Sequence, residues 1–286
     1  MPPTRSMSAR PVTRVGLAAN LHSDVALPLL YRLVPLLASH GVKISLDEDL
    51  AEVASAFSQC QLGIEDPCDV LIAIGGDGTI LKLARRYVDR GIPIVGVKGG
   101  RLGFLTESTA EGVTDMLLSG RFDVQDRMRI TGRVHGGTTG AKSFSALNDV
   151  VIHSTGYSRM LTLRVEVGGL LLRELSADGV IVATPTGSTA YSLSAGGPVL
   201  EPTLDAIMVT PLNPHTMSIR PMVLDASETV QVKVTAAPSG LMITIDGQEG
   251  IEMALSERIE IRRDSRVTRL VIPENYDFFA RLREKF

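Results

Sequence analysis

The segment Asp69–Thr79 reads Asp-Val-Leu-Ile-Ala-Ile-Gly-Gly-Asp-Gly-Thr, an apolar run that ends in glycines placed around one carboxylate. The unbroken apolar residues Val70–Ile74 predict a strand that is buried on both faces. Only one of the four residues Gly75–Gly78 has a side chain, so backbone N–H groups can close around an anion while Asp77 is held among them. The segment therefore predicts a buried strand that delivers an anion-binding loop.

A helix is predicted directly after this loop, because apolar residues from Ile80 to Val88 recur at helical spacing. The N-terminus of that helix would point back at the loop, an arrangement that favours a bound phosphate group. The simpler interpretation is a strand-to-helix turn in which Asp77 or Thr79 only caps the helix. The loop alone leaves both interpretations open, since it matches neither the G-x-G-x-x-G nor the G-x-x-x-x-G-K-[ST] pattern.

Length and composition restrict the class of protein. The chain of 286 residues suits about two domains, and 44% hydrophobic with 21% charged residues is typical of globular proteins. A net charge of -3 and the absence of Trp give no reason to expect nucleic acid as a partner. No apolar run reaches the roughly 18 residues that span a bilayer, so we expect a soluble protein without a membrane partner. Cys60 and Cys68 suit neither a zinc site nor a redox pair, which favours a reducing cytoplasm.

Strands and helices alternate over the first part of the chain. Strands are expected at Arg14–Ala19, Val42–Leu46, Val70–Ile74 and Ile92–Val97, and helices at Ala26–Ser39, at Ala51–Phe57 and from a Ser108–Glu111 capping box to about Ser119. Pro35 lies deep within the first helix and predicts a kink or a break. This alternation predicts an α/β domain with a parallel, Rossmann-like sheet covered on both faces. Its ligands should bind at the carboxyl ends of the strands, where the glycine loops lie.

After Gly120 short strands dominate without long helices between them. They are expected at Phe144–Ile152 with interruptions, Leu161–Val167, Leu170–Leu175, Val180–Ala183, Thr229–Thr235, Leu241–Ile245, Arg258–Ile261 and Val267–Ile272. This pattern predicts a mainly antiparallel β domain, a β-sandwich or a distorted barrel. At the end of the chain, Tyr276, Phe279, Leu282, Arg283 and Phe286 lie at helical spacing, which predicts a C-terminal helix that returns to the first domain. We therefore expect domains at residues 1–122 and 123–273, followed by the helix at 274–286.

Two polar stretches in the second domain are candidates for a binding site. Hydroxyl groups crowd the stretch Asp178–Leu200 beside Tyr191 and can offer neutral hydrogen bonds to a sugar or a purine, although a solvated loop is the alternative. Asn148-Asp149 suits a purine edge and a ribose diol, but such a pair alone is more often an Asx turn. Asp246-Gly247-Gln248 is by itself only a hairpin-turn signal. The histidines are scattered without ligand spacing, so we expect no built-in metal site.

Taken together, five motifs resemble the NAD kinase family, in its bacterial ATP-NAD kinase form, in their order and approximate spacing. They are Gly75–Thr79, Arg101–Leu105, Ala146–Asp149, Thr184–Ser192, and Pro214–Met217 followed by Arg220-Pro221. The resemblance extends from Val70 to Asp246 and to the aromatic tail, and its most specific element is Thr184–Ser192. Diacylglycerol-type lipid kinases and 6-phosphofructokinases carry a similar glycine-aspartate loop, so only the ensemble points to NAD.

The resemblance implies transfer of the ATP γ-phosphoryl group to the 2′-hydroxyl of the adenosine ribose of NAD, with Mg²⁺ accompanying ATP. It makes Asp77 the catalytic carboxylate, expected where the two domains meet, and it makes Gly75, Gly76, Gly78 and Thr79 the phosphate loop. The residues that it assigns to NAD are Asp77, Gly78, Lys82, Asn148, Asp149, Arg159, Asp178, Thr189, Ala190, Tyr191, Ser192, Leu193, Ser194 and Gln248. For Lys82 and Arg159 a solvated side chain is an equally good interpretation.

The resemblance also implies a homo-oligomer, a tetramer or a dimer. Carboxylates that face a free 2′-hydroxyl would disfavour a phosphate already there, so NAD should be a better acceptor than NADH or NADP. Two positions depart from the family pattern, Lys98 in place of a frequent Asn and Ser176 in place of an occasional basic residue, which leaves their roles open. Inorganic polyphosphate presents the same terminal phosphoryl group as ATP and stays an open donor.

Two other functions compete with the kinase. A lipid kinase of the same superfamily would need an apolar acceptor cleft, which the hydroxyl-rich loop Thr184–Ser194 does not supply. A non-catalytic NAD(P)-binding sensor would not need the carboxylate of Asp77 beside donor phosphates.

Overall fold

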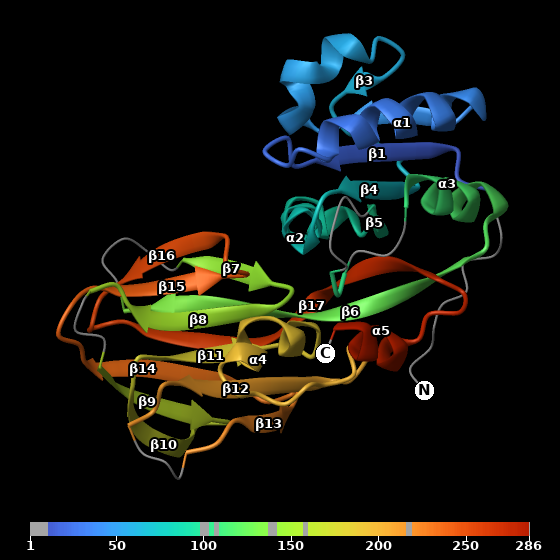
Figure 1. The fold of residues 1–286 in the computed structure, drawn as a ribbon. Coiled ribbons are helices and arrows are strands. Elements are labelled where there is room, and N and C mark those ends of the chain that lie inside the picture. The colour runs from blue at the N-terminus through green and yellow to red at the C-terminus, as the bar shows by residue number, and fades with distance from the viewer. Residues whose placement is uncertain are drawn as a thin grey trace. The chain divides into compact units, whose positions relative to one another are not determined.

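The computed structural model describes residues 11–97, 103–105, 109–136, 142–156, 160–215 and 219–285. The chain divides into two compact units. Unit 1 comprises the segment up to Asp126 and the segment from Thr268 onward, and unit 2 comprises Arg127–Val267. Two long strands, β6 (Phe122–His135) and β17 (Arg258–Pro273), have residues in both units (Figure 1).

Unit 1 is built on a parallel sheet with the strand order β5-β4-β1-β2-β3, to which β17 adds Leu270 beside Ile94. Its strands are β1 (Arg14–Ala19), β2 (Lys43–Leu46), β3 (Gln61–Leu62), β4 (Val70–Ile74) and β5 (Ile94–Val97). Its helices are α1 (Ala26–Ser39), α2 (Asp77–Arg86), α3 (Ala110–Ser119) and α5 (Phe278–Lys285), with the 3₁₀ helices η1 (Glu48–Ala56) and η2 (Val88–Arg90). None of the helices in the described ranges is long and apolar enough to cross a membrane.

The parallel sheet is buried on both faces, as the apolar run in β4 predicts. All five residues of β4 are buried. Helices α1 and α3 contribute to the core cluster that contains Val15 and Ile72, while α2 contacts β1, β4 and β5. Leu71 and Ala73 alternate with Ile72 and are equally buried, as a strand covered on both sides requires. The predicted α/β architecture is confirmed.

Two details of the helices in unit 1 differ from the prediction. Helix α1 runs through Pro35 without a break. Because proline has no N–H, Pro35 cannot donate the helical hydrogen bond to the Tyr31 carbonyl. Both residues are exposed, so water can hydrogen bond to that carbonyl instead. The N-cap of α3 is Thr109, whose Oγ1 accepts the Gly112 N–H at 3.2 Å. The predicted cap, Ser108, lies outside the described residues.

Unit 2 is a β-sandwich, one of the two predicted forms. One sheet has the order β13-β12-β11-β8-β15-β16, and the other contains β10-β9-β14-β17, with β6 pairing to β17 and β7. Its further strands are β7 (Ser143–Ala146), β8 (Asp149–Ser154), β9 (Leu161–Val167), β10 (Leu170–Ala177), β11 (Gly179–Ala183), β12 (Ala206–Leu212), β13 (Met222–Asp225), β14 (Val230–Ala236), β15 (Leu241–Ile245) and β16 (Glu249–Met253). Buried apolar side chains of both sheets form one core, for example Ile152, Val180 and Val232.

The other face of the first sheet is covered by a segment that contains the 3₁₀ helix η3 (Thr186–Thr189) and the short helix α4 (Tyr191–Ser194). Ala195 and Leu200 of this segment pack against Val151, Ile181 and other outward-facing residues of the sheet. The hydroxyl-rich stretch that the sequence singled out therefore lies over a sheet face (Figure 1).

The predicted C-terminal helix is present as α5 and belongs to unit 1. The ammonium group of Lys285 lies 5.3 Å from the centroid of the Phe104 ring. The predicted aromatic stripe is wrong, because Phe278 is the buried residue and Phe279 is 57% exposed. The predicted stripe starts at Tyr276, but the helix begins only at Phe278, so the helical spacing applies to fewer residues. Asp277 precedes the helix, and its Oδ1 accepts the Phe279 and Ala280 N–H groups at 2.8 and 3.0 Å. Phe286 lies outside the described residues.

Candidate active site

The glycine loop follows β4 at the carboxyl edge of the unit 1 sheet. The Gly75 N–H donates to the Val97 carbonyl at 3.2 Å, and Gly75 has a φ of +148°. A Cβ at this position would lie 2.6 Å from Thr79 Oγ1. Glycine is therefore required at Gly75 for both conformation and space. Helix α2 begins at Asp77 with Gly76 as its N-cap, so the positive end of the helix dipole lies at the loop.

Asp77 does not cap α2 with its side chain. Its two carboxylate oxygens accept the Phe104 N–H at 2.9 Å and the Leu105 N–H at 3.1 Å. Asp77 thus joins the two glycine-containing loops of unit 1, and its side chain is only partly buried. The helix-capping interpretation of Asp77 does not hold. Lys98, Arg101 and Leu102 of the second loop lie outside the described residues.

Lys82 points from α2 to an acidic group in the same unit. It forms an ion pair with Asp49 that lowers the pKa of that carboxyl. Arg86 pairs with Asp47 and Asp49, and the Tyr87 hydroxyl donates to Asp47 at 2.8 Å. This cluster fixes α2 to η1 and its preceding residue. The assignment of Lys82 to NAD stays a prediction.

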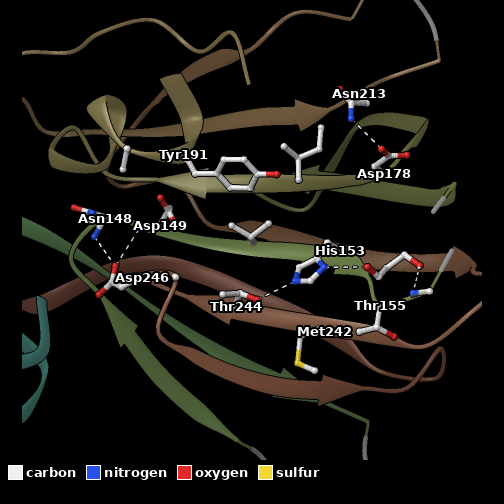
Figure 2. A pocket seen from close by; sticks show the side chains of 16 residues that line it. Asn148, Asp149, His153, Thr155, Asp178, Tyr191, Asn213, Met242, Thr244 and Asp246 are labelled. Carbon is white, nitrogen blue, oxygen red and sulfur yellow. Dashed lines mark hydrogen bonds between the residues drawn. The ribbon is translucent and has the colours of Figure 1, made fainter. Parts of the chain in front are cut away.

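Unit 2 contains a cavity of about 750 Å³ on the outward face of its first sheet (Figure 2). We refer to it as the unit 2 cavity. Its lining residues are Asn148, Asp149, Val151, His153, Ser154, Thr155, Gly156, Asp178, Ala190, Tyr191, Leu212, Asn213, Met242, Thr244, Asp246 and Gly247. Most are polar, and the strands β8, β12 and β15 supply the floor. A cavity of this size and mixed polarity suits a nucleotide.

The cavity brings together some of the residues that the sequence assigned to a dinucleotide. Asn148, Asp149, Asp178, Ala190 and Tyr191 all line it. Figure 2 shows Asn148 and Asp149 near the Tyr191 ring, and Asp178 at another part of the rim, where it accepts the Asn213 Nδ2–H at 2.9 Å.

Other assigned residues do not line the cavity. Ser192 is fully buried and its hydroxyl shares a hydrogen bond of 2.8 Å with Thr210 Oγ1. The Thr189 hydroxyl donates to the Thr186 carbonyl at 3.2 Å. Leu193, Ser194 and Gln248 are outside the lining set. Arg159, Thr216 and Met217 lie outside the described residues. Ser176 lies in β10, and its carbonyl accepts the His215 N–H at 2.9 Å.

The Asn148-Asp149 turn is fixed by the loop above it. Thr184 is fully buried, and its hydroxyl donates to the Leu147 carbonyl at 2.6 Å while accepting the Gly187 N–H at 3.0 Å. The Thr184 N–H donates to the Asn148 carbonyl at 2.9 Å. A hydroxyl side chain is needed here because one group must both donate and accept. The hydroxyl-rich loop therefore positions the turn as well as lining the cavity.

Sequence reasoning missed Asp246, which it treated only as a turn residue. Asp246 lines the cavity, and its carboxylate accepts the backbone N–H groups of Leu147, Asn148 and Asp149 at 3.0, 2.7 and 3.2 Å. The predicted Asx turn at Asn148 is thus replaced by a turn whose acceptor is 98 residues away. The Asp-Gly pair signals a hairpin turn, but local spacing carries no signal of this distant contact.

The carboxyl of Asp149 is buried at the edge of the cavity. Burial raises the pKa of Asp149 to about 7, and the negative charge of Asp246 acts in the same direction, while a hydrogen bond from the Tyr191 backbone N–H opposes it. Burial also raises the pKa of Asp246, against the three N–H groups and the charge of Arg129. Two nearby buried carboxyls in a cavity are a recognised feature of functional sites.

We predict that this shift is visible as a dependence of stability on pH. The folded protein keeps a proton on Asp149 up to about pH 7, whereas the unfolded chain releases it near pH 3.8. The stabilisation is complete below the unfolded pKa and is lost as pH rises to about 7, with a slope of up to about 1.4 kcal/mol per pH unit. The measurement is the free energy of unfolding of wild type minus that of Asp149→Asn, in denaturant, from pH 4 to 8. A difference that is constant over this range would contradict the assignment.

Within the described residues, no group of three or more His, Cys, Asp or Glu side chains is placed to hold a metal ion.

The fold and these two sites define the class of protein. A glycine loop at the carboxyl edge of a parallel sheet, followed by a helix N-terminus, suits phosphate groups, and a polar cavity with an Asn and a carboxyl suits a nucleoside. Together they are typical of a nucleotide-dependent phosphotransferase.

Comparison with known proteins gives the family. The family model described as the ATP-NAD kinase N-terminal domain matches residues 15–119, and the one described as the ATP-NAD kinase C-terminal domain matches residues 147–272. The chain is 36% identical over 276 residues to the NAD kinase of Geotalea daltonii, covering 95% of this chain and 97% of that protein. It is 41% identical over 241 residues to the NAD kinase of Gemmatimonas aurantiaca, covering 83% and 82% of the two chains. The chain belongs to the NAD kinase family.

Solved structures agree with this assignment. A yeast NADH kinase complexed with NADH superposes with a TM-score of 0.87 at 25% identity, covering 96% of this chain and 87% of that one. An NAD kinase from Archaeoglobus fulgidus in complex with ATP gives a TM-score of 0.74 at 25% identity, covering 95% and 98%. The fold and family that the motifs indicated are confirmed.

Proposed function

We propose that this protein is an ATP-dependent NAD kinase that transfers the γ-phosphoryl group of ATP to the 2′-hydroxyl of the adenosine ribose of NAD, giving NADP. The observation that carries the proposal is the side chain of Asn148. Its Oδ1 is buried at the unit 2 cavity without a hydrogen-bond partner in the protein. A buried acceptor without a partner costs free energy unless a ligand supplies the donor.

A purine edge meets the requirements of Asn148. The amide oxygen accepts from the exocyclic amino group of adenine while the amide nitrogen donates to a ring nitrogen, the pairing that Asn makes with adenine elsewhere. Asp149 follows Asn148 directly in the chain and can accept a ribose hydroxyl, so the pair suits an adenosine. Tyr191 offers a half-exposed ring at the same cavity. We assign the dinucleotide to these residues and to Asp178 and Ala190, with Arg159, Lys82 and Gln248 as further proposed contacts.

In unit 1, the proposed donor site is the glycine loop. Phosphoryl transfer depends mainly on positioning and on neutralising charge, and the positive end of the α2 dipole favours phosphate groups at this loop. Gly75, Gly76, Gly78 and Thr79 form the proposed phosphate loop, in which the N–H groups of Gly75 and Thr79 hold the loop itself by donating to the Val97 and Gly76 carbonyls at 3.2 and 3.0 Å. We propose that Asp77 orients or deprotonates the acceptor hydroxyl. The approach of Asp77 to the unit 2 cavity during catalysis stays a prediction.

Mg²⁺ is proposed as the ion that accompanies ATP. It prefers oxygen ligands and is usually bound through one or two carboxylates and the substrate phosphates. In the loop Gly75–Thr79 the only carboxylate is that of Asp77, whose oxygens already accept two backbone N–H groups. These residues fit an ion held chiefly by the ATP phosphates, and when bound it would neutralise charge on the transferred group.

We also propose that the protein acts in the cytoplasm as a homo-oligomer, a tetramer or a dimer. The free thiols of Cys60 and Cys68 support a reducing compartment. The motifs shared with NAD kinases support the oligomer, which size-exclusion chromatography with light scattering would test.

The decisive experiment incubates purified protein with ATP, Mg²⁺ and NAD and detects the product with an NADP-specific dehydrogenase. We expect NADP formation well above that of an Asp77→Asn control. No NADP above this control would refute the kinase. A parallel reaction with inorganic polyphosphate in place of ATP tests whether polyphosphate can also donate the phosphoryl group.

We predict that NAD is the preferred acceptor. Because one solved relative is described as an NADH kinase, NAD, NADH and NADP should be compared at equal concentrations. Asp149 and Asp246 place two acidic groups at the cavity. Above about pH 7, where Asp149 is charged, a 2′-phosphate would meet like charge and bind poorly. The readout is kcat/KM for NAD and NADH, and the dissociation constant for NADP. Equal kcat/KM for NADH, or NADP binding tighter than NAD, would contradict this preference.

A further inference from the structure

The backbone of the Asn148-Asp149 turn is organised by one carboxylate from another hairpin. Oδ2 of Asp246 accepts the Leu147 N–H at 3.0 Å, and Oδ1 accepts the Asn148 and Asp149 N–H groups at 2.7 and 3.2 Å. In return, the Asp246 N–H donates to the Asp149 carbonyl at 2.9 Å. Figure 2 shows the Asp246 carboxylate beneath Asn148 and Asp149, which both line the cavity. Four hydrogen bonds therefore connect the two segments.

The hairpin turn by itself does not require an aspartate. Asp246 has a φ of +50° and Gly247 a φ of +65° in the connection between β15 and β16, where the Gln248 N–H donates to the Ile245 carbonyl at 2.9 Å. Asn-Gly suits this turn at least as well as Asp-Gly. Only a carboxylate, with acceptor capacity on both oxygens, can take three N–H groups at once. The carboxylate is thus explained by the distant turn and not by the hairpin.

A buried positive charge stands near this carboxylate. Arg129 of β6 is fully buried, and its charge acts on Asp246. The Arg129 Nε donates to the Ser145 hydroxyl at 3.0 Å, and that hydroxyl donates to Asp264 Oδ2 at 2.7 Å. A fully buried guanidinium is unusual unless it serves a buried carboxylate. The strand β6 that carries Arg129 has no role in lining the cavity.

We propose that Asp246 is a positioning residue that holds the Asn148-Asp149 turn in the shape that presents both side chains to the bound adenosine. This rests on the proposed function for the identity of the ligand. Asp246 does not need to touch the reacting atoms. Its action passes through the backbone N–H groups of three consecutive residues, so it affects where the purine and ribose contacts lie.

Asp246→Asn tests the proposal, since it keeps the turn conformation and the side-chain shape but removes one acceptor. We expect KM for NAD to rise about ten- to hundredfold, the loss typical of hydrogen bonds to a charged group. KM for ATP should stay within about twofold, because no residue of the glycine loop is involved. Amide hydrogen exchange at residues 147–149 should become faster, while exchange in the core strand β9 stays unchanged.

A matched control is Asp225→Asn, an exposed carboxylate in the same unit that accepts the Ser227 N–H at 2.8 Å in a turn away from the cavity. It should leave KM for NAD unchanged. Unchanged KM and unchanged exchange at residues 147–149 in Asp246→Asn would overturn the proposal. If the wild-type protein formed no NADP, the proposed kinase activity would be refuted. The hydrogen-exchange measurement at residues 147–149 would still test whether Asp246 positions the turn.

Discussion

Replacing Asp77 by asparagine is expected to lower kcat by about 10²- to 10⁴-fold, the range for loss of a positioned general base. The carboxylate lies in the glycine loop at the start of α2 and is only partly buried, so a substrate hydroxyl can reach it. An amide cannot accept a proton at neutral pH. It also replaces one acceptor by a donor opposite the Phe104 or Leu105 N–H. The measurement is the steady-state rate of NADP formation with saturating ATP and NAD.

The hydrogen bonds of Asp77 make a control essential, because a loss of activity could arise from a displaced loop. Asp69 offers the match, since it belongs to the same unit and its Oδ2 accepts the Thr13 and Arg14 N–H groups, both at 2.9 Å. Asp69→Asn should reduce stability by a similar amount and leave kcat close to wild type. If Asp77→Asn retains near wild-type turnover, Asp77 is not catalytic. If its KM for ATP rises while kcat is kept, Asp77 only anchors the second loop.

Elements with a strong local signal were predictable from the sequence. The strands β1 and β4 and the helix α1 have the predicted bounds. All three have a clear apolar pattern, and two of them have a glycine close to their end, Gly75 after β4 and Gly41, with a φ of +76°, shortly after α1. Their boundaries are set by neighbours in the chain, which is why local reasoning was enough.

Strands with charged or interrupted sequences were missed. Strand β6 contains Arg127 and Arg129, which are buried, so its apolar alternation is broken where tertiary partners override it. Strand β12 contains Pro211, a residue that argues against a central strand. Strand β12 pairs with β13 only up to Val209. Pro211 lies beyond this paired part, where no N–H is needed for a hydrogen bond to β13. Strand β17 was predicted as two strands, because its centre is charged and resembles a loop.

The candidate site was predictable in its chemistry but not in its construction. Asn148, Asp149 and Tyr191 were recognised by residue type and motif, and they do line one cavity. The hydrogen bonds that hold them come from Thr184 and Asp246, which are far away in sequence. Such contacts form only when β8 pairs with β11 and β15, so no local spacing reports them.

Gly187 gives the second large expected effect. A Cβ at this position would lie 2.0 Å from the Asn148 carbonyl oxygen and 2.5 Å from its carbonyl carbon. Both are backbone atoms of a turn that Thr184 and Asp246 hold in place, so they cannot move aside without breaking those hydrogen bonds. Gly187→Ala should therefore destabilise the protein by about 3 kcal/mol or more, the range of severe overpacking.

The same substitution should raise the dissociation constant for NAD at least about a hundredfold, because displacing the turn moves the Asn148 and Asp149 side chains. Gly196→Ala is the matched control in the same segment, since Gly196 has a φ of +84° but no atom within 4 Å of the added Cβ. It should cost only the left-handed strain, about 1 kcal/mol, and leave NAD binding nearly unchanged. Chemical unfolding and calorimetric titration with NAD measure both effects. Equal consequences for the two variants would show that the approach of Gly187 to the Asn148 carbonyl determines neither stability nor NAD binding.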